Sequence, residues 1–247
     1  TVVPFDEIPE VMRDAMVAAE DADFYRHEGL DYVGLARAVY TNLRRGELSQ
    51  GASTITQQVV KNLVLSPERT IRRKVQEALL AFRLEDNLTK DEILTIYLNE
   101  IFFGVRYYGV EEASRYYFGH SASDLDLTEA ALLAGMVQSP NRYNPYRNPD
   151  AALARRSYVL RQMWEKGYIE ESTYREAEQA PLTLASPESR SEYEDAFPYY
   201  VDAVRRTLLE HFDAEDVFGG GLDVHTALDP VAQRTAVEAL RAGLRAF

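Results

Sequence analysis

Apolar side chains recur every three or four positions along much of this chain, which predicts a helical protein. That period places them on one face of an α-helix, where they can be buried against a neighbour. Residues that interrupt helices, such as Gly46, Pro67 and Gly104, lie between the periodic segments. The predicted helices are Val11–Ala19, Tyr32–Leu43, Ile71–Phe82, Ile93–Ile101, Ala130–Val137 and Ala152–Trp164.

Two of these helices have recognisable start signals. Thr89 and Glu92 are spaced as in a capping box, in which the two side chains bond each other's backbone N–H groups. Pro149 and Asp150 precede the segment that carries Arg155, and proline is favoured in the first turn of a helix. We therefore expect helices to begin close to positions 90 and 149.

The composition is that of a globular protein, and it limits the classes of partner. Hydrophobic residues make up 46% of the 247 residues, enough for one large domain with a small extension. The net charge of −13 argues against a nucleic-acid partner, because proteins that bind the phosphate backbone are usually basic. The absence of cysteine excludes disulfides and thiolate metal sites, and it is compatible with export. No apolar run reaches the roughly 18 residues of a transmembrane helix.

The composition changes near position 180, which predicts a boundary. Proline, serine and glutamate cluster in Ala180–Glu194, and the helical period stops there. Beyond it we expect a helix over Tyr199–Phe212, a short strand over Leu222–Thr226 and a helix that begins at Pro230. These elements are too few for a core of their own. The predicted division is a main domain at 1–180, a linker at 181–196 and a small connector at 197–247.

Two segments concentrate reactive polar side chains, EDADFYRHEG at Glu20–Gly29 and GASTITQQVVKN at Gly51–Asn62. In the first, the predicted helix ends near Glu20, where the negative end of the helix dipole disfavours a carboxylate. The adjacent Asp21 adds repulsion of like charge, so both effects raise the pKa of Glu20 toward the range of a general base. The spacing alone leaves open that both acids are merely solvated at a helix end. His27 is more simply explained as a structural, hydrogen-bonded histidine.

The second segment has polar side chains on two adjacent faces of a helix. A cap made by Ser53 or Thr54 would leave free N–H groups at the positive helix end, which suits a diphosphate or a sugar hydroxyl. A lysine one or two turns later would supply a mobile charge for phosphate oxygens. The alternative is an amphipathic helix with a solvent face. The two faces carry Ser53, Gln57 and Lys61, and Thr54, Gln58 and Asn62.

The segment RRKVQEALLAFRLE, Arg72–Glu85, is apolar on two sides and is expected to form a buried helix around Glu77. An ion pair with Arg73, four residues earlier, would account for such a buried charge. Alternatively, Glu77 faces a cleft opposite Glu20, with Lys74 beside it. The aromatic run that follows, from Phe102 to Tyr108, is expected in the core unless it forms a patch that contacts lipid.

Five segments, in this order, resemble the signature motifs of the peptidoglycan glycosyltransferases, the family that polymerises lipid II. The stretch Phe197–Phe247 resembles the connector that follows this domain in class A penicillin-binding proteins. The resemblance implies a mainly α-helical, lysozyme-like lobe, a smaller membrane-proximal lobe and a short β-containing connector. It also implies a membrane anchor and a transpeptidase domain outside this sequence. The five segments are Glu20–Gly29, Gly51–Asn62, Arg72–Glu85, Lys90–Gly104 and Ala131–Pro145.

The resemblance also implies roles for individual residues. Glu20 would be the catalytic base, and Glu77 would be a second catalytic carboxylate that orients the leaving diphosphate directly or through a divalent cation, Mg²⁺ or Mn²⁺. No cofactor is otherwise implied. Asn99 has a simpler expected role, holding a loop by side-chain hydrogen bonds. The implied substrate-binding residues are Asp21, Ser53, Thr54, Gln57, Gln58, Lys61, Asn62, Arg69, Arg73, Lys74 and Asn99.

The expected reaction is inverting transfer that joins lipid II units into glycan strands and releases undecaprenyl diphosphate. It would take place at the outer face of the bacterial cytoplasmic membrane, with lipid II, the nascent strand and the membrane surface as partners. The alternatives are a lysozyme-like hydrolase that uses Glu20 and Glu77, a monofunctional glycosyltransferase, and a non-catalytic glycan-binding module. The loop Arg44–Gly51 is expected to become ordered when a lipid diphosphate binds.

Overall fold

The computed structural model describes residues 2–32, 34, 53–63, 70–105, 107–185, 198–213, 217 and 224–245. The chain divides into two compact units, Thr1–Leu184 and Ala185–Phe247, and each is described by itself. Within the described ranges, no helix has both the length and the apolar character needed to cross a membrane.

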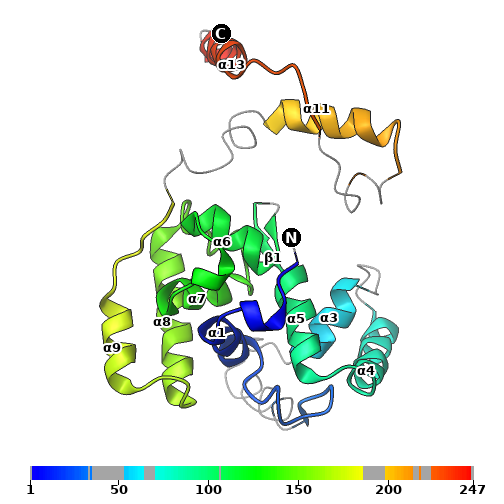
Figure 1. Ribbon diagram of the computed structural model, residues 1–247, viewed down its shortest axis with the longest axis vertical. Helices are drawn as coiled ribbons and strands as arrows, with labels where there is room; N and C mark the ends of the chain where they lie inside the picture. Colours follow the sequence, from blue (N-terminus) through cyan, green and yellow to red (C-terminus); the bar gives the residue numbers. More distant parts are fainter. Residues whose placement is uncertain are drawn as a thin grey trace. The chain divides into compact units, whose positions relative to one another are not determined.

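The first unit is almost entirely helical (Figure 1). Every predicted helix that lies within the described residues is confirmed, with ends that differ by up to three residues. The helix predicted over Tyr32–Leu43 lies almost wholly outside those residues. The elements are η1 (Phe5–Glu7), α1 (Glu10–Glu20), α3 (Ile55–Leu63), α4 (Ile71–Glu85), α5 (Lys90–Glu100), β1 (Phe102–Gly104), β2 (Tyr107–Tyr108), α6 (Val110–Phe118), η2 (Ala122–Asp124), α7 (Leu127–Met136), α8 (Pro149–Glu165) and α9 (Glu171–Gln179).

The predicted start signals are confirmed. Thr89 caps α5, and it and Glu92 accept hydrogen bonds from each other's backbone N–H groups. Pro149 is the first residue of α8. A second capping box, which the sequence analysis missed, joins Asp126 and Glu129 at the start of α7. Local sequence therefore sets where these helices begin.

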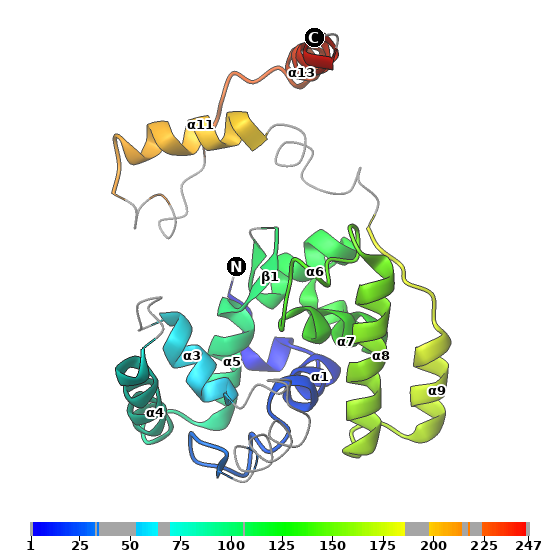
Figure 2. The same ribbon diagram turned by 180° about the vertical axis from the view of Figure 1, so that it is seen from behind.

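The core lies where α1, α7 and α8 pack against one another. The helix α7 is apolar all round, and each residue from Ala130 to Met136 is buried. A helix of this kind must be enclosed by neighbours. On the other side of the unit, α3 packs against α4 and α5 (Figures 1 and 2). The C-terminal end of α1 meets α3 between these two groups, and this junction holds the acidic residues discussed below.

The helix α4 is not buried on two sides, contrary to the sequence prediction. Val75 and Leu79 expose 54% and 59% of their surface, whereas Glu77 exposes 1%. The reason is that α4 packs on α3 and α5 with one face only. The carboxylate therefore lies on the inward face, and part of the apolar surface of the helix faces solvent.

The hairpin β1–β2 follows α5 and contains the aromatic run. Phe103 is fully buried, while Tyr108 exposes 59% of its surface, so the run is partly core and partly surface. The hairpin ends at Gly109, which has a φ of +82° and lies so close to α5 that an added Cβ would meet the Asn99 carbonyl oxygen at 2.5 Å. Glycine is required at this position for both reasons.

The second unit contains α11 (Pro198–Leu209) and α13 (Pro230–Arg245). Both predicted helices are confirmed. The predicted strand Leu222–Thr226 is not borne out where it can be examined, since Val224–Thr226 have no strand geometry. Val224 is exposed, and a strand needs a neighbour to satisfy its backbone groups. Most of the predicted linker lies outside the described residues.

Candidate active site

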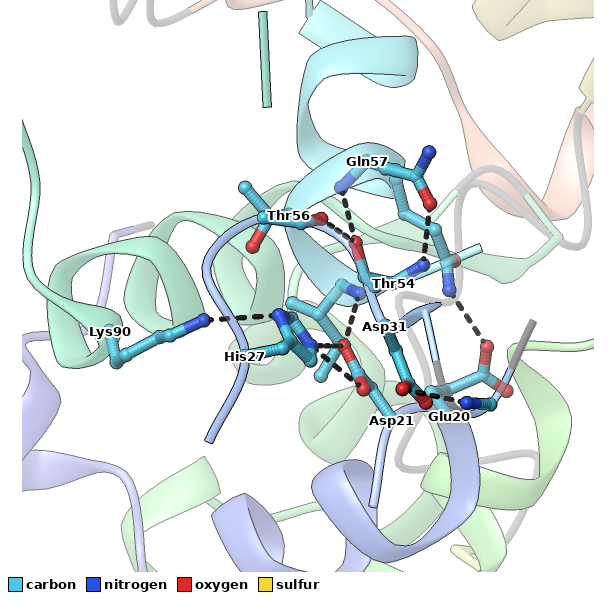
Figure 3. Close-up of polar contacts among 12 residues, drawn as sticks. Glu20, Asp21, His27, Asp31, Thr54, Thr56, Gln57 and Lys90 are labelled. Carbon is cyan, nitrogen blue, oxygen red and sulfur yellow. Dashed lines mark hydrogen bonds and ion pairs between the residues drawn. The ribbon is translucent and has the colours of Figure 1, made fainter. Parts of the chain in front are cut away.

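Glu20 and Asp21 are adjacent in sequence but have different partners (Figure 3). Glu20 is the last residue of α1 and is half-buried. The side-chain amide of Gln58, on α3, donates from Nε2 to Glu20 Oε2 over 3.1 Å. The hydroxyl of Tyr97, on α5, donates to Gln58 Oε1 over 3.0 Å. Within the described ranges, the other oxygen of Glu20 has no protein donor and can take a proton from a bound molecule.

The pKa of Glu20 is raised above its ordinary value, as the sequence predicted, but for a different main reason. Burial of the carboxyl group is the largest cause, and repulsion from Asp21 is the smallest. The hydrogen bond from Gln58 and the positive charge of Arg155 act in the opposite direction. A carboxylate with a raised pKa is a better proton acceptor near neutral pH than an exposed one.

Arg155 is held in place by the core helices. Its Nε donates to the carbonyl oxygen of Gly135 over 3.2 Å, and its guanidinium lies over the rings of Tyr158 and Tyr143 at 4.3 and 5.8 Å. A side chain at Gly135 would bring a Cβ within 2.9 Å of Arg155 Cγ. The glycine therefore makes room for the cation that acts on Glu20.

Asp21 is buried and its carboxylate is fully engaged. It accepts hydrogen bonds from Ile55 N at 2.9 Å and from His27 Nε2 at 3.0 and 3.1 Å. The ammonium group of Lys90 lies 3.4 Å from the other ring nitrogen, Nδ1. Because an ammonium can only donate, Nδ1 accepts and the ring proton resides on Nε2, facing Asp21. The prediction of a structural histidine is confirmed.

Lys90 extends this chain of contacts to α4 and α3. Its ammonium donates to Glu85 Oε1 over 2.7 Å, and Thr56 Oγ1 donates to the same oxygen over 2.5 Å. We call these five residues the floor network: Asp21, His27, Lys90, Glu85 and Thr56. The network joins the ends of α1, α3, α4 and α5. Its charged groups are hydrogen-bonded to one another, as buried charges must be.

Of the two predicted caps, Ser53 and Thr54, it is Thr54 that caps α3. Its hydroxyl accepts from Gln57 N at 3.1 Å and donates to the Gly29 carbonyl at 2.7 Å, and Gln57 Oε1 accepts from Thr54 N at 3.0 Å. The backbone N–H of Ile55 is bonded to Asp21. The expectation of free N–H groups at this helix end is therefore wrong for three of them. Thr54 and Gln57 are buried at the start of α3, where both make these structural hydrogen bonds.

A second polar cluster forms around Glu77. Lys74 makes an ion pair with Glu77, and its ammonium also donates to Ser53 Oγ over 3.0 Å. Glu77 is buried, whereas Lys74 is exposed. This cluster brings together three predicted site residues. Arg73 lies on the same helix, and Arg69 is outside the described residues.

Lys61 and Asn62 are exposed at the C-terminal end of α3. Asn62 lines an open hollow of about 390 Å³, which has both polar and aromatic walls. The hollow is also lined by Leu63, Glu100, Ile101, Phe102, Tyr108, Val137 and Pro140. The predicted contact of the aromatic run with lipid stays a prediction.

Asn99 has a structural role. Its side chain exchanges two hydrogen bonds with the backbone of Val3, at 2.8 and 2.9 Å, and donates to the Thr95 carbonyl at 2.9 Å. It holds the N-terminal segment against α5, so the expectation that it holds a chain segment is confirmed. This placement gives no support to a role in substrate binding.

The residues around Glu77 do not by themselves form a metal site. A divalent cation usually takes several oxygen ligands, and Glu77 supplies one carboxylate that is already paired with Lys74. The part of the chain that the structure describes contains no group of three acidic or histidine side chains able to hold a metal ion.

Sequence reasoning missed Tyr97 and Arg155, both of which act on Glu20 or its partner. Tyr97 lies on an apolar face of the helix predicted over Ile93–Ile101, and that pattern by itself indicates packing. A signal was present, since a buried tyrosine hydroxyl usually needs a hydrogen-bond partner. No local pattern connects Arg155 to a residue 135 positions earlier.

Comparison with known proteins shows the family to which the chain belongs. The model of the family described as Transglycosylase matches residues 1–164. The chain belongs to the transglycosylase family. It is 42% identical over 243 residues to penicillin-binding protein 1A of Aquifex aeolicus (strain VF5), covering 98% of this chain and 33% of that protein. It is 44% identical over 238 residues to penicillin-binding protein 1A/1B of Bacillus subtilis (strain 168), covering 94% and 26%.

The fold is also found in a solved structure. Penicillin-binding protein 1A from Haemophilus influenzae superposes with a TM-score of 0.52 at 24% identity, over 88% of this chain and 22% of that one. The chain therefore spans about a third or less of the length of these relatives. It is a transglycosylase domain with a mainly helical, lysozyme-like fold, and it is a glycosyltransferase, as the sequence motifs predicted.

Proposed function

We propose that this transglycosylase domain polymerises lipid II into glycan strands with release of undecaprenyl diphosphate. The observation that carries the proposal is the state of Glu20, a half-buried carboxylate with a raised pKa and, among the described residues, one oxygen without a protein donor. The substrate would be lipid-linked, so the domain would work at the outer face of the bacterial cytoplasmic membrane, with the membrane surface, lipid II and the growing strand as partners.

In the proposed reaction, Glu20 takes the proton from the 4-hydroxyl of the acceptor GlcNAc. The hydroxyl oxygen bonds to C1 of the donor MurNAc from the side opposite the leaving group, and the bond from C1 to the diphosphate oxygen breaks. The configuration at C1 is inverted, and the electron pair leaves with undecaprenyl diphosphate. A diphosphate departs as a stable anion, so this reaction needs one base and a source of positive charge rather than a second acid.

The proposed source of positive charge is the exposed cations on α3 and α4. Lys74 is held by Glu77 and Ser53, which would orient its ammonium toward diphosphate oxygens. Lys61 is exposed two turns after Thr54 and would add a mobile charge. Arg69, proposed for the same role by its place in the sequence motif, lies outside the described residues.

Hydrolysis of finished glycan is the less favoured function. A glycosidase of the usual kind needs one carboxylic acid and one carboxylate on either side of the bond. Glu77 is tied to the ammonium of Lys74, an arrangement suited to holding a cation near an anionic group. A Glu20 base together with an ammonium held by Glu77 fits transfer with loss of diphosphate better.

Incubation of the protein with lipid II, followed by separation of the products by size, tests the proposal. Polymeric glycan is expected from the wild type and not from Glu20→Gln. Hydrolysis of finished strands without any lipid-linked substrate would support the hydrolase instead. Binding of lipid II by both variants with no product from either would indicate a non-catalytic module.

A further inference from the structure

Among the described residues, the side-chain amide of Gln58 donates a hydrogen bond to Glu20. Its Nε2 lies 3.1 Å from Glu20 Oε2. A glutamine amide carries two donors on its nitrogen and only acceptors on its oxygen, so the same side chain turned over would present an acceptor to the carboxylate. The direction of this amide decides whether Gln58 stabilises or repels the Glu20 anion.

Tyr97 engages the opposite end of that amide. Its hydroxyl lies 3.0 Å from Gln58 Oε1, and its side chain is 1% exposed within the core on α5. Burial, with smaller effects from the charges of Glu20 and Asp21, raises the pKa of the Tyr97 hydroxyl, which therefore keeps its proton and stays a donor. Turning the amide over would remove the acceptor from Tyr97 and would place the oxygens of Gln58 and Glu20 against each other.

We propose that Tyr97 is a positioning residue for the base: its hydroxyl holds the Gln58 amide so that the NH₂ group, and not the oxygen, faces Glu20. The inference rests on the base function of Glu20 proposed above. Tyr97 does not touch the reacting atoms. It acts through one intermediary, along the path Tyr97 hydroxyl, Gln58 amide and Glu20 carboxylate.

Removal of the hydroxyl has a defined consequence for the charge on Glu20. In Tyr97→Phe the ring remains, but Gln58 Oε1 has lost its donor whenever the NH₂ group faces the Glu20 anion. Once Glu20 is protonated, the amide can turn over and accept a hydrogen bond from the carboxyl O–H. The substitution therefore favours the protonated form, and the loss of one neutral hydrogen bond predicts an upward shift of about 0.4 to 1 pH unit in the pKa of Glu20.

Other charged groups near Glu20 stay in place when Tyr97 is changed. Those that act on it from the described elements are Asp21 at the end of α1 and Arg155 on α8. Asp21 is fixed by its own bonds to His27 and to the backbone of α3. Arg155 is fixed by the Gly135 carbonyl. Their effects on Glu20 are the same in both variants, so the shift isolates the contribution of the hydroxyl.

The direct test is a titration of the Glu20 carboxyl group, followed by NMR of protein labelled with ¹³C at glutamate carboxyl carbons. The Glu20 signal is identified by its disappearance in Glu20→Gln. A matched control is Tyr117→Phe, because Tyr117 is also fully buried and its hydroxyl donates to the Phe103 carbonyl over 2.9 Å. We expect the upward shift in Tyr97→Phe and none in Tyr117→Phe. The same titration midpoint in the wild type and Tyr97→Phe would overturn the proposal.

A double variant tests whether Tyr97 acts through Gln58. In Gln58→Leu the amide is gone, so adding Tyr97→Phe is expected to leave the Glu20 midpoint unchanged. A further upward shift in the double variant would show that the hydroxyl acts by another route, and it would overturn the proposed path. Thermal unfolding of each variant checks that the compared proteins are folded.

The rate of polymerisation provides an independent readout. The acid side of its pH profile should move upward by the same amount in Tyr97→Phe, while the rates of the two proteins converge to within about threefold at pH values above both midpoints. A purely structural role for Tyr97 would lower the rate equally at every pH and contradict the proposal. The titration needs no activity, so a wild type that makes no glycan would refute the proposed function and leave the Tyr97 test intact.

Discussion

Glu20 and Asp21 are neighbours in sequence, yet they occupy opposite kinds of environment. Asp21 belongs to the floor network, where two donors, the backbone N–H of Ile55 and the His27 ring, satisfy its charge. Among the described residues, Glu20 accepts its hydrogen bond from Gln58, and burial of its carboxyl group raises its pKa. The difference shows that a pair of adjacent acids can divide into a structural and a reactive member through their partners alone.

The largest expected effect separates these two residues by activity. Glu20→Gln should lower the rate of polymerisation by about 10² to 10⁴, because it removes the base and keeps the shape of the side chain. The folded protein should be at least as stable as the wild type at neutral pH, since a costly buried charge is removed. Product formation from lipid II and thermal unfolding measure the two quantities. A rate like that of the wild type would remove Glu20 from the mechanism.

Asp21 should show its main effect in stability. Asp21→Ala leaves the N–H of Ile55 and the His27 ring without an acceptor and should cost about 3 kcal/mol in the free energy of unfolding. Unfolding in urea measures this cost. Asp23→Ala is the control, because its ion pair with Arg26 is largely exposed and should contribute little. Equal losses in the two variants would contradict the distinction between the floor network and the surface.

The exposed lysines on α3 and α4 should affect the binding of a diphosphate and leave the free energy of unfolding almost unchanged. Lys61→Ala should weaken binding of a lipid-linked diphosphate by about 1.5–3 kcal/mol, the value of a charge-assisted hydrogen bond, and should barely change binding of undecorated glycan. Calorimetry with both ligands measures the difference. Lys166→Ala, at the end of α8, is the matched control. Similar losses for the two ligands would argue against a diphosphate site at Lys61.

The smallest expected effect is the pH dependence of stability that Glu20 contributes. Its pKa in the folded protein lies above its ordinary value of 4.5, so folding favours the protonated form. The stability of the wild type relative to Glu20→Gln should therefore rise as the pH falls through the folded pKa, and it should level off below about 4.5. Urea unfolding of both proteins across this range measures it. If the free energy of unfolding of the wild type, relative to that of Glu20→Gln, fell with decreasing pH, the fold would stabilise the anion of Glu20.

The helices could be predicted from the sequence because their signals are local. Apolar spacing and the Thr89 capping box placed α5, and side-chain type placed the start of α3 at Ser53 or Thr54, of which Thr54 is the cap. Predictions that depended on neighbours in space were less successful. The N–H groups expected to be free at α3 are largely bonded to the side chains of Asp21, Gln57 and Thr54. Leu79 is exposed because α4 has partners on one face only.

The site was predicted in part for the same reason. The polar motifs identified Glu20, Gln58, Lys74 and Glu77, which the structure places in two hydrogen-bonded clusters. They could not show that Tyr97 bonds to Gln58, 39 residues away, because that contact depends on how α5 packs against α3. The segment Arg44–Gly51, predicted to become ordered on ligand binding, lies outside the described residues.

The floor network also has a consequence for the order of events in folding. Its contacts join Asp21 to α3, 34 residues later, and His27 to Lys90, 63 residues later, so several loops must close before any of its charges is paired. Until then each charged group is better solvated by water than by the chain. The network should therefore form after the folding transition state. Substitutions in it should chiefly accelerate unfolding and leave the folding rate nearly unchanged. The intact network would then slow the unfolding of the helices that carry Glu20.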